Sequence, residues 1–230
     1  EEQAVAEISS VLDLIEYVAS VFGLILDKDY RYRLSLGDRA DTEKYYKNDG
    51  GWEKAEGLLR TLMQARNSKF EEAKGEAAFY GPKIDIQMKN VNGKEDTAFT
   101  VQYDFCMPER FDLTYIGEDG AKHRAFVVHR SSIGAIERIM AFLIEKYAGA
   151  FPLWLSPVQV KVLPVSEKHN EYANEVNAAL RAANIRAEVD DANESLGKKI
   201  RNAKTEKIPY LLVVGDKEVE AKTISVDSRD

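Results

Sequence analysis

The octapeptide Ala78-Phe79-Tyr80-Gly81-Pro82-Lys83-Ile84-Asp85 places an apolar turn directly before an alternating strand. In that strand Ile84, Ile86 and Met88 alternate with polar residues, so we expect one buried face and one polar face. The pair Asn92-Gly93 follows, and Asn-Gly favours the hairpin turn that matches the twist of two paired strands. The sequence therefore predicts a β-hairpin with a tyrosine and a lysine at its entrance.

The second strand of this hairpin also alternates. Its polar and apolar faces are formed by Thr100, Gln102 and Asp104 and by Val101, Tyr103 and Phe105, respectively. A third strand, 125–128, ends at His129, and a helix over 131–148 carries Arg138 about two turns in. Together these strands predict an antiparallel sheet with helices on one side. The polar residues predict one wall of a pocket for an anionic ligand that carries phosphate.

The rest of the chain indicates two different architectures. Before the octapeptide, the periodicity predicts helices over 2–23 and 52–66 and a strand over 30–36. Pro152 and Pro157 bracket a short connector. Beyond it, strands and helices alternate: strands 158–162, 186–189, 210–214 and 223–228, and helices 167–184 and 194–206. We therefore predict an α/β (α+β) protein with an antiparallel-sheet domain in 1–151 and a small mixed-sheet α/β domain in 152–230.

Composition narrows the class of protein. The chain has 230 residues, 44% of them hydrophobic, which suffices for a sizeable core. The formal net charge of −7 excludes attraction of nucleic acid by the whole surface, so any RNA contact must be local. A single cysteine, Cys106, excludes an intrachain disulfide and fits a cytoplasmic location. No apolar run approaches the roughly 20 residues of a membrane span, and we expect no membrane partner.

Each candidate residue also has a purely structural interpretation. A polar face on the strand at 100–105 is ordinary in a half-solvated sheet. His129 alone suits a hydrogen-bonded strand-end histidine better than a metal site, because zinc needs three or four ligands and the other histidines lack the spacing. The guanidinium of Arg138 suits polyphosphate, because it is always charged and binds in a bidentate way. A surface ion pair with Glu137 or Glu145 explains Arg138 equally well.

These motifs resemble those of the class II aminoacyl-tRNA synthetases and, within that class, the threonyl-tRNA synthetases. The similar stretches are Ala78–Asp85, Gln102–Phe105, Tyr115–Asp119, His129–Arg138, Tyr147–Val160 and Asp216–Glu220. Within them, Gly134–Arg138 is similar to motif 3 of the class. The resemblance covers essentially the whole chain and is weakest over 29–70.

The resemblance implies that the family activates threonine with ATP and Mg²⁺ and transfers it to the 3′ end of its tRNA. His129 matches one of three protein ligands of a zinc ion that coordinates the amino and hydroxyl groups of threonine, which valine cannot imitate. Arg138 matches an arginine that holds ATP, Tyr80 matches a tyrosine near the threonine amino group, and Thr100 and Gln102 match polar positions of the active-site sheet. The resemblance thus implies that Arg138, Tyr80 and Gln102 act in catalysis by positioning and charge neutralisation, with Thr100 and Arg138 at the cofactor.

In the second domain, Asn193, Arg201 and Glu218 match the family's anticodon-reading positions. Asn and Glu hydrogen-bond base edges, whereas Arg stacks on bases or binds phosphate. Without the resemblance, Arg201 is a solvated helix residue. The implied partners are tRNA(Thr), threonine and ATP, and the implied full-length protein is a cytoplasmic homodimer.

Three departures from the family pattern alter these expectations. In the family the remaining zinc ligands and motifs 1 and 2 precede the position of residue 1, so we expect a C-terminal part of a synthetase that is inactive alone. The family usually has Trp-Gln-Cys just before the position of Thr100, with the Gln on ATP, where this chain has Asp96-Thr97-Ala98-Phe99. On the last strand, the position where the family has an arginine is Asp227 in this chain. The closing helix of the family's anticodon domain is not found before Asp230.

Two other functions remain open from the sequence. Thr97, Phe99 and Asp227 favour a non-catalytic RNA-binding or regulatory protein derived from a synthetase. A metabolic α/β enzyme that binds a nucleotide in the second domain is disfavoured, because no Gly-rich phosphate loop follows 158–162.

Overall fold

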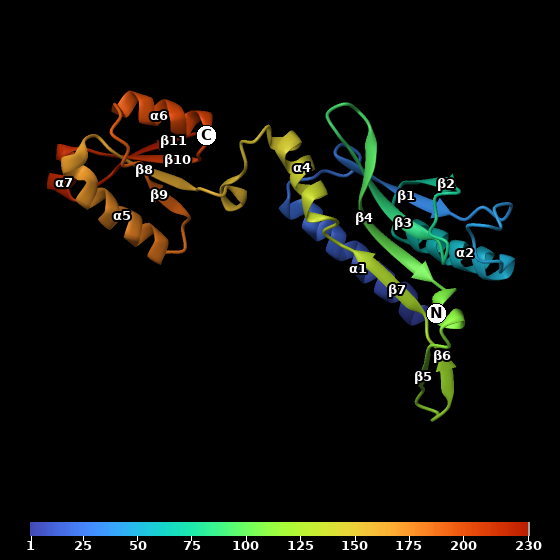
Figure 1. Ribbon diagram of the computed structural model, residues 1–230. Helices are drawn as coiled ribbons and strands as arrows, with labels where there is room; N and C mark the ends of the chain where they lie inside the picture. Colours follow the sequence, from blue (N-terminus) through green and yellow to red (C-terminus); the bar gives the residue numbers. More distant parts are fainter. Residues whose placement is uncertain (230) are drawn as a thin grey trace. The chain divides into compact units, whose positions relative to one another are not determined.

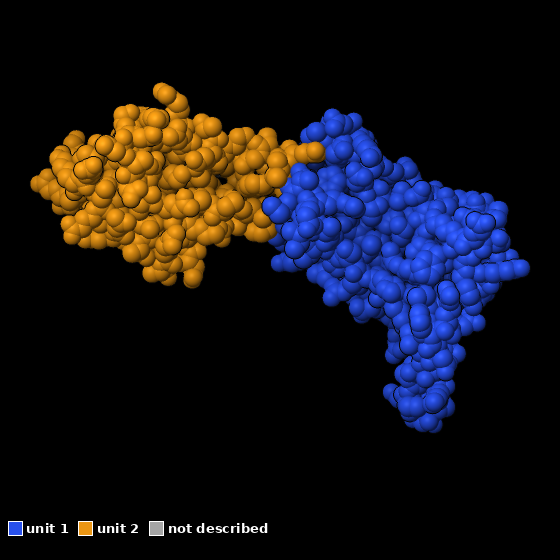
Figure 2. All heavy atoms as spheres, viewed as in Figure 1, with its two compact units in different colours: residues 1–142 blue, residues 143–230 orange. Residues whose placement is uncertain are grey.

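The computed structural model of the chain describes residues 1–229. It divides into two compact units, residues 1–142 and 143–230 (Figure 2). The predicted domain boundary at 151/152 falls inside the second unit and stays a prediction. Among the described residues, no helix is long and apolar enough to cross a membrane.

A five-stranded sheet with the order β2-β1-β3-β4-β7 forms the frame of the first unit (Figure 1). Its strands are β1 (Tyr30–Leu36), β2 (Phe70–Lys74), β3 (Lys83–Lys89), β4 (Glu95–Asp104) and β7 (Val127–Ser131). Neighbours pair antiparallel, as predicted, except β1 and β2, which are parallel. The sequence pattern does not indicate β2, because this edge strand is mostly polar and exposed.

Two helices cover one side of this sheet, as expected. Helix α1 (Glu2–Val21) packs against β4 and β7, and helix α2 (Asp49–Ala65) packs against β1 (Figure 1). The buried residues of α1 recur at the predicted helical spacing: Ile8, Val11, Leu12, Ile15 and Ala19. Helix α2 begins three residues before the predicted start, because the Asn48 side chain accepts a hydrogen bond from the Gly51 amide at 2.9 Å and caps the helix.

The segment around His129 differs from the sequence prediction. Strand β7 runs through Ser131, so His129 lies in the middle of a strand and not at its end. Helix α4 (Ile136–Tyr147) begins five residues later than predicted, and Arg138 therefore lies in its first turn and not two turns in. The reason is Gly134, whose φ of 77° is left-handed, so the helix cannot run through it and begins only after it.

A short helix and a second hairpin connect β4 to β7. They are α3 (Met107–Arg110), β5 (Thr114–Ile116) and β6 (Lys122–Arg124). Strands β5 and β6 pair antiparallel, and the Gly117 amide donates to the Ala121 carbonyl across the turn. The motif Tyr115–Asp119 thus forms one arm and the turn of this hairpin.

The second unit contains the predicted mixed sheet, with the order β11-β10-β8-β9. Its strands are β8 (Val160–Pro164), β9 (Ala187–Val189), β10 (Tyr210–Val214) and β11 (Ser225–Ser228). Strand β8 pairs parallel with β9 and β10, whereas β11 is antiparallel to β10. The helices are α5 (Asn170–Ala182), α6 (Leu196–Thr205) and α7 (Asp216–Ala221), with 3-10 turns at Leu153–Leu155 and Glu167–His169.

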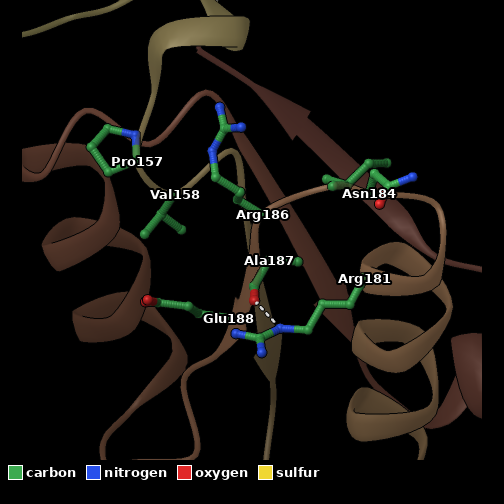
Figure 3. A pocket seen from close by; sticks show the side chains of 8 residues that line it. Pro157, Val158, Arg181, Asn184, Arg186, Ala187 and Glu188 are labelled. Atoms are coloured by element: carbon green, nitrogen blue, oxygen red, sulfur yellow. Dashed lines mark hydrogen bonds between the residues drawn. The ribbon is translucent and has the colours of Figure 1, made fainter.

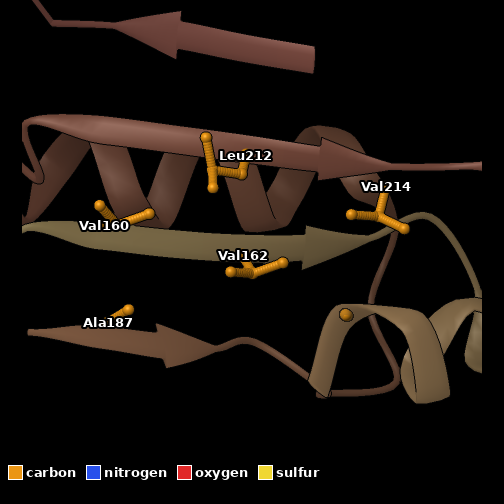
Figure 4. Packing of buried hydrophobic residues seen from close by; sticks show 6 residues of the cluster. Val160, Val162, Ala187, Leu212 and Val214 are labelled. Carbon is orange, nitrogen blue, oxygen red and sulfur yellow. The ribbon is translucent and has the colours of Figure 1, made fainter. Parts of the chain in front are cut away.

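Strand β10 is buried on both faces, which explains its continuous apolar sequence. Leu212 and Val214 join Val160, Val162 and Ala187 in one cluster, against which α5 packs (Figure 4). Leu211, on the other face, joins a second cluster that contains Ala203 of α6. The mixed sheet thus has helices on both faces, and its three parallel strands end at one edge.

We predict that Leu212→Ala lowers the free energy of unfolding of residues 143–230 by about 2–5 kcal/mol, because Leu212 is only 4% exposed and its truncation leaves a cavity. Urea denaturation with hydrogen exchange resolved by residue measures the loss. Val226→Ala, at a position 59% exposed on β11, is the matched control and should change stability by less than about 0.5 kcal/mol. Equal effects of the two variants would contradict the assigned core.

Candidate functional site

Strand register gathers the predicted residues of the first unit into two polar rows. One row crosses β1, β3, β4 and β7 at Ser35, Lys83, Gln102 and His129. The next row crosses the same strands at Arg33, Asp85, Thr100 and Ser131. Because side chains alternate along each strand, both rows lie on the same face of the sheet. The structure therefore brings Thr100, Gln102 and His129 together, as the sequence predicts.

The carboxylate of Asp85 joins three of these strands. It is fully buried and accepts hydrogen bonds from Ser35 Oγ at 2.7 Å and Thr100 Oγ1 at 2.9 Å. It also pairs with Arg33 Nη2 at 3.1 Å and Lys83 Nζ at 3.0 Å. Arg33 Nη2 also pairs with Glu76 Oε2 at 3.4 Å, so the two cations of this cluster are balanced by two carboxylates.

Tyr80, Gln102 and His129 lie side by side. The Tyr80 hydroxyl donates a hydrogen bond to Gln102 Oε1, and the rings of Tyr80 and His129 have centroids 5.0 Å apart. Burial, together with the charge of Asp104, raises the pKa of Tyr80. Tyr80 therefore stays a protonated hydrogen-bond donor at neutral pH.

Asp104 on strand β4 orients the ring of His129 on the neighbouring strand β7. Its carboxylate is fully buried, and Oδ2 lies 2.8 Å from His129 Nε2. Its other oxygen accepts from the amides of Cys106 and Met107 at 3.0 and 2.8 Å. The interpretation of this polar face as merely solvated is thus wrong for Asp104.

The geometry of His129 bears on the implied zinc. Within residues 1–229, no group of three or more His, Cys, Asp and Glu side chains is arranged to hold a metal ion. Because Nε2 is engaged by Asp104, a metal bond would fall to Nδ1. One imidazole nitrogen held by a carboxylate fits a single zinc ligand, so the other ligands would have to come from outside the described residues.

Arg138 lies beside β4. It is exposed, and its Nη1 donates to the main-chain carbonyl of Thr97. Thr97 occupies the position where the family pattern has Gln, and its hydroxyl accepts from Gln87 Nε2 at 2.6 Å. A glutamine amide is thus present beside this position, but it comes from the neighbouring strand β3.

Two glycines allow close backbone approach at this site. A Cβ on Gly81 would lie 1.9 Å from the carbonyl oxygen of Tyr103, and one on Gly134 would lie 2.1 Å from that of Ala98. Both contacts are far below any real Cβ contact, so only glycine fits at either position. Gly134 thus brings the loop before α4 against β4.

The predicted residues of the second unit lie near the carboxyl ends of its parallel strands. Asn193 follows β9, Glu218 follows β10, and Arg201 lies in the second turn of α6. Asn193 and Arg201 are exposed. Glu218 also has an internal role, because its carboxylate accepts from Ser225 Oγ at 2.7 Å and from the Gly215 amide at 2.9 Å. The Ser225 bond, reinforced by the Gly215 amide, lowers the pKa of Glu218 and keeps it ionised.

Asp227, the departure on the last strand, has a partner in this chain. It faces α6 and pairs with Lys204 Nζ at 2.8 Å. Asp227 lies opposite Leu211 near the amino end of β10, so a carboxylate stands there where the family pattern has an arginine.

The second unit also has a hollow of about 450 Å³ at the amino ends of β8 and β9 (Figure 3). Arg181 Nε donates to the Ala187 carbonyl at 3.0 Å, and Arg186 Nη2 donates to the Trp154 carbonyl at 2.7 Å. These arginines therefore satisfy main-chain carbonyls. None of the predicted site residues lines this hollow, which lies at the strand ends opposite to Asn193 and Glu218.

The sequence reasoning missed two buried polar residues in the second unit. His169 is 4% exposed; its Nδ1 accepts from the Ser166 amide at 3.1 Å and its Nε2 lies 3.0 Å from Asp216 Oδ1. Lys199 is 3% exposed. A signal exists for Lys199, since it occupies an inward position of α6 between the apolar Leu196 and Ala203.

Comparison with known proteins identifies the family. The model described as "tRNA synthetase class II core domain (G, H, P, S and T)" matches residues 2–147, and the "Anticodon binding domain" matches residues 159–230. The first match covers more than half of the chain. This chain belongs to the class II aminoacyl-tRNA synthetases, and it combines their core domain with an anticodon-binding domain.

Individual relatives carry the name threonine–tRNA ligase. The chain is 53% identical over 226 residues to that of Listeria monocytogenes, which covers 98% of this chain and 35% of the relative. It is 51% identical over 228 residues to that of Clostridium botulinum, with 99% and 35% covered. The chain thus spans about a third of the length of these relatives.

A solved structure shows the same architecture. The RNA binding domain of threonyl-tRNA synthetase from Cryptosporidium parvum Iowa II matches with a TM-score of 0.89 and 30% identity, over 100% of this chain and 56% of that chain. The predicted fold class and family are therefore confirmed.

We predict that Asp85→Ala lowers the free energy of unfolding of the first unit by about 3–5 kcal/mol, because Arg33 and Lys83 lose their buried counter-charge. Chemical denaturation measures the loss. Glu71→Ala removes a carboxylate that is 72% exposed from a pair with Arg31 and should cost less than about 1 kcal/mol. A small effect of Asp85→Ala would show that the carboxylate does not join the strands.

We also expect Gly134→Ala to destabilise the first unit by at least about 1–3 kcal/mol, because alanine is strained at a φ of 77° and its Cβ would meet the Ala98 carbonyl. Gly57→Ala is the control: it lies inside α2 with no atom within 4 Å of the added Cβ, so it should stabilise by up to about 1 kcal/mol. Thermal unfolding of both variants makes the comparison. Stabilisation by both would mean that the Gly134 turn is not needed.

Proposed function

We propose that this chain is the part of a threonine–tRNA ligase that supplies the active-site sheet and the anticodon reader. The ligase activates threonine with ATP and transfers it to tRNA(Thr). The observation that carries the proposal is the placement of Tyr80, Gln102 and His129 together on one polar face. The similarity to proteins named threonine–tRNA ligase supports the choice of amino acid.

The polar rows suit binding and orientation and offer no side-chain nucleophile. Tyr80 and Gln102 would hydrogen-bond the amino acid, and ATP with its Mg²⁺ would bind beside them. Arg138 is exposed, and its guanidinium would bind phosphate once its hydrogen bond to the Thr97 carbonyl is broken. Thr100 donates to Asp85, so it supports the cofactor side of the sheet by holding that carboxylate.

His129 would hold the zinc together with ligands from the rest of the protein. When bound, the zinc would supply a Lewis acid that distinguishes the hydroxyl of threonine from the methyl of valine. The role of Asp104 here would be to hold the imidazole through Nε2, which would leave Nδ1 for the zinc. A homodimeric, cytoplasmic full-length enzyme accords with this function.

Asn193, Arg201 and Glu218 would read the anticodon of tRNA(Thr). Asn193 precedes α6, Arg201 lies in α6 and Glu218 lies in α7; the exposed amide and guanidinium and the partly buried carboxylate suit base edges and phosphate. Specificity for single-stranded loops requires such exposed polar groups rather than a basic surface, which agrees with the net charge of −7.

A second candidate function is a non-catalytic RNA-binding protein. Two observations favour it. The Thr97 hydroxyl accepts a hydrogen bond from the Gln87 amide, and the Asp227 carboxylate forms an ion pair with Lys204. Both remove a contact expected of the family, one at ATP and one at the tRNA.

Binding of anticodon stem–loop RNA to the full chain at fixed salt tests the proposal. We expect a threonine anticodon to bind at least about 10-fold more tightly than the same stem–loop with one anticodon base changed, since a base contact is worth about 1–3 kcal/mol. Asn193→Ala should reduce this preference, whereas Asn174→Ala, on the exposed side of α5, should not. Equal binding of both RNAs would favour the second candidate, and absence of binding would contradict both.

A further inference from the structure

A buried lysine lies behind the predicted anticodon residues. Lys199 is only 3% exposed and sits on the inward face of α6, whereas Arg201 on the same helix is exposed. Lysine is almost never fully buried without a partner, because its ammonium loses hydration. The position therefore calls for a specific interaction.

The ammonium of Lys199 binds two main-chain carbonyls. It donates to the Pro164 oxygen at 3.2 Å and to the Asp190 oxygen at 2.8 Å. Pro164 is the last residue of β8, and Asp190 directly follows β9. Lys199 thus joins α6 to the carboxyl ends of two neighbouring parallel strands.

This arrangement is costly if it serves only stability. Within residues 1–229, Lys199 has no ion-pair partner, so its charge is compensated by carbonyl dipoles alone. An apolar side chain of similar size would pack against the same cluster without a desolvation cost. What lysine adds is the fixed position of the two strand ends.

The fixed strand end begins the loop that carries Asn193. The Asp190 amide donates to the Val162 carbonyl at 2.9 Å, and the Glu194 carboxylate accepts from Lys198 Nζ at 2.6 Å at the far end of the loop. Asn193 lies between these two anchors and is itself exposed. Of the two anchors, only the one at Asp190 is held by a buried charge, because Lys198 is exposed.

We propose that Lys199 is a positioning residue for anticodon reading: it holds the loop of Asn193 at the carboxyl end of β9 so that the Asn193 amide meets one base of the anticodon. The inference rests on the proposed function of the second unit. A group that contacts ligand works only when the groups behind it fix its orientation, and Lys199 is such a group. It touches no RNA itself, because it is buried.

A double-mutant cycle tests this role. Affinities of the full chain are measured for a threonine-anticodon stem–loop and for three stem–loops that each carry one changed anticodon base. We expect Lys199→Met to reduce discrimination about 5-fold or more at the base that Asn193→Ala also affects, with little change at the other bases. Adding Lys199→Met to Asn193→Ala should then change discrimination less than about 2-fold, because the two act through one contact.

The control is Lys204→Met, which removes an ammonium from an exposed position of the same helix. It should weaken all four RNAs alike. If Lys199→Met fails to fold, Lys199→Gln keeps a donor on a shorter stem and should show an intermediate loss at the same base. Hydrogen exchange at the Asp190 amide should rise in either variant, while Leu212 stays protected.

The outcomes separate the two proposals. If the unmodified chain does not discriminate anticodons, the proposed function fails and the inference falls with it. If the unmodified chain discriminates and Lys199→Met keeps that discrimination, or if the two substitutions add independently, Lys199 is only structural and this inference alone is overturned.

Discussion

The buried carboxylate of Asp85 constrains the strand register of the first unit. Asp85 accepts from Ser35 and Thr100 and pairs with Arg33 and Lys83, so it binds β1, β3 and β4 at the same point. Because the carboxylate is fully buried, each lost donor would leave charge without compensation. The register of the three strands is therefore specified on the polar face as well as on the apolar face. That register is what aligns the two rows of candidate residues.

The same device recurs elsewhere in the chain. Asp104 holds His129 and the start of α3, and Lys199 holds the ends of β8 and β9. In each case a buried charged group binds main-chain or side-chain partners from separate elements and lies directly behind an exposed candidate residue. Where a site acts by holding its ligands in position, the precision of such supports determines how well those ligands are oriented.

Most of the strands and helices could be predicted from local pattern. The octapeptide, the Asn-Gly hairpin and the alternation of Thr100, Gln102 and Asp104 depend only on neighbours in the chain, and the structure confirms the hairpin and its faces. The predicted start of α4 was wrong, because the left-handed turn at Gly134 depends on contact with Ala98, more than 30 residues earlier. Strand β2 was not predicted, because an exposed and mostly polar edge strand shows no alternation of apolar and polar residues.

By itself the sequence determined the fold class, the order of elements and the identity of the polar residues, because periodicity and turn chemistry are properties of short segments. The family resemblance added the candidate site residues, from Tyr80 to Glu218. Only the tertiary structure decided that Gln102 faces His129, that Asp85 and Asp104 are buried, and that Lys199 binds two strand ends. These facts follow from register and packing between distant segments, and no local pattern encodes which distant carbonyl or carboxylate a side chain will meet.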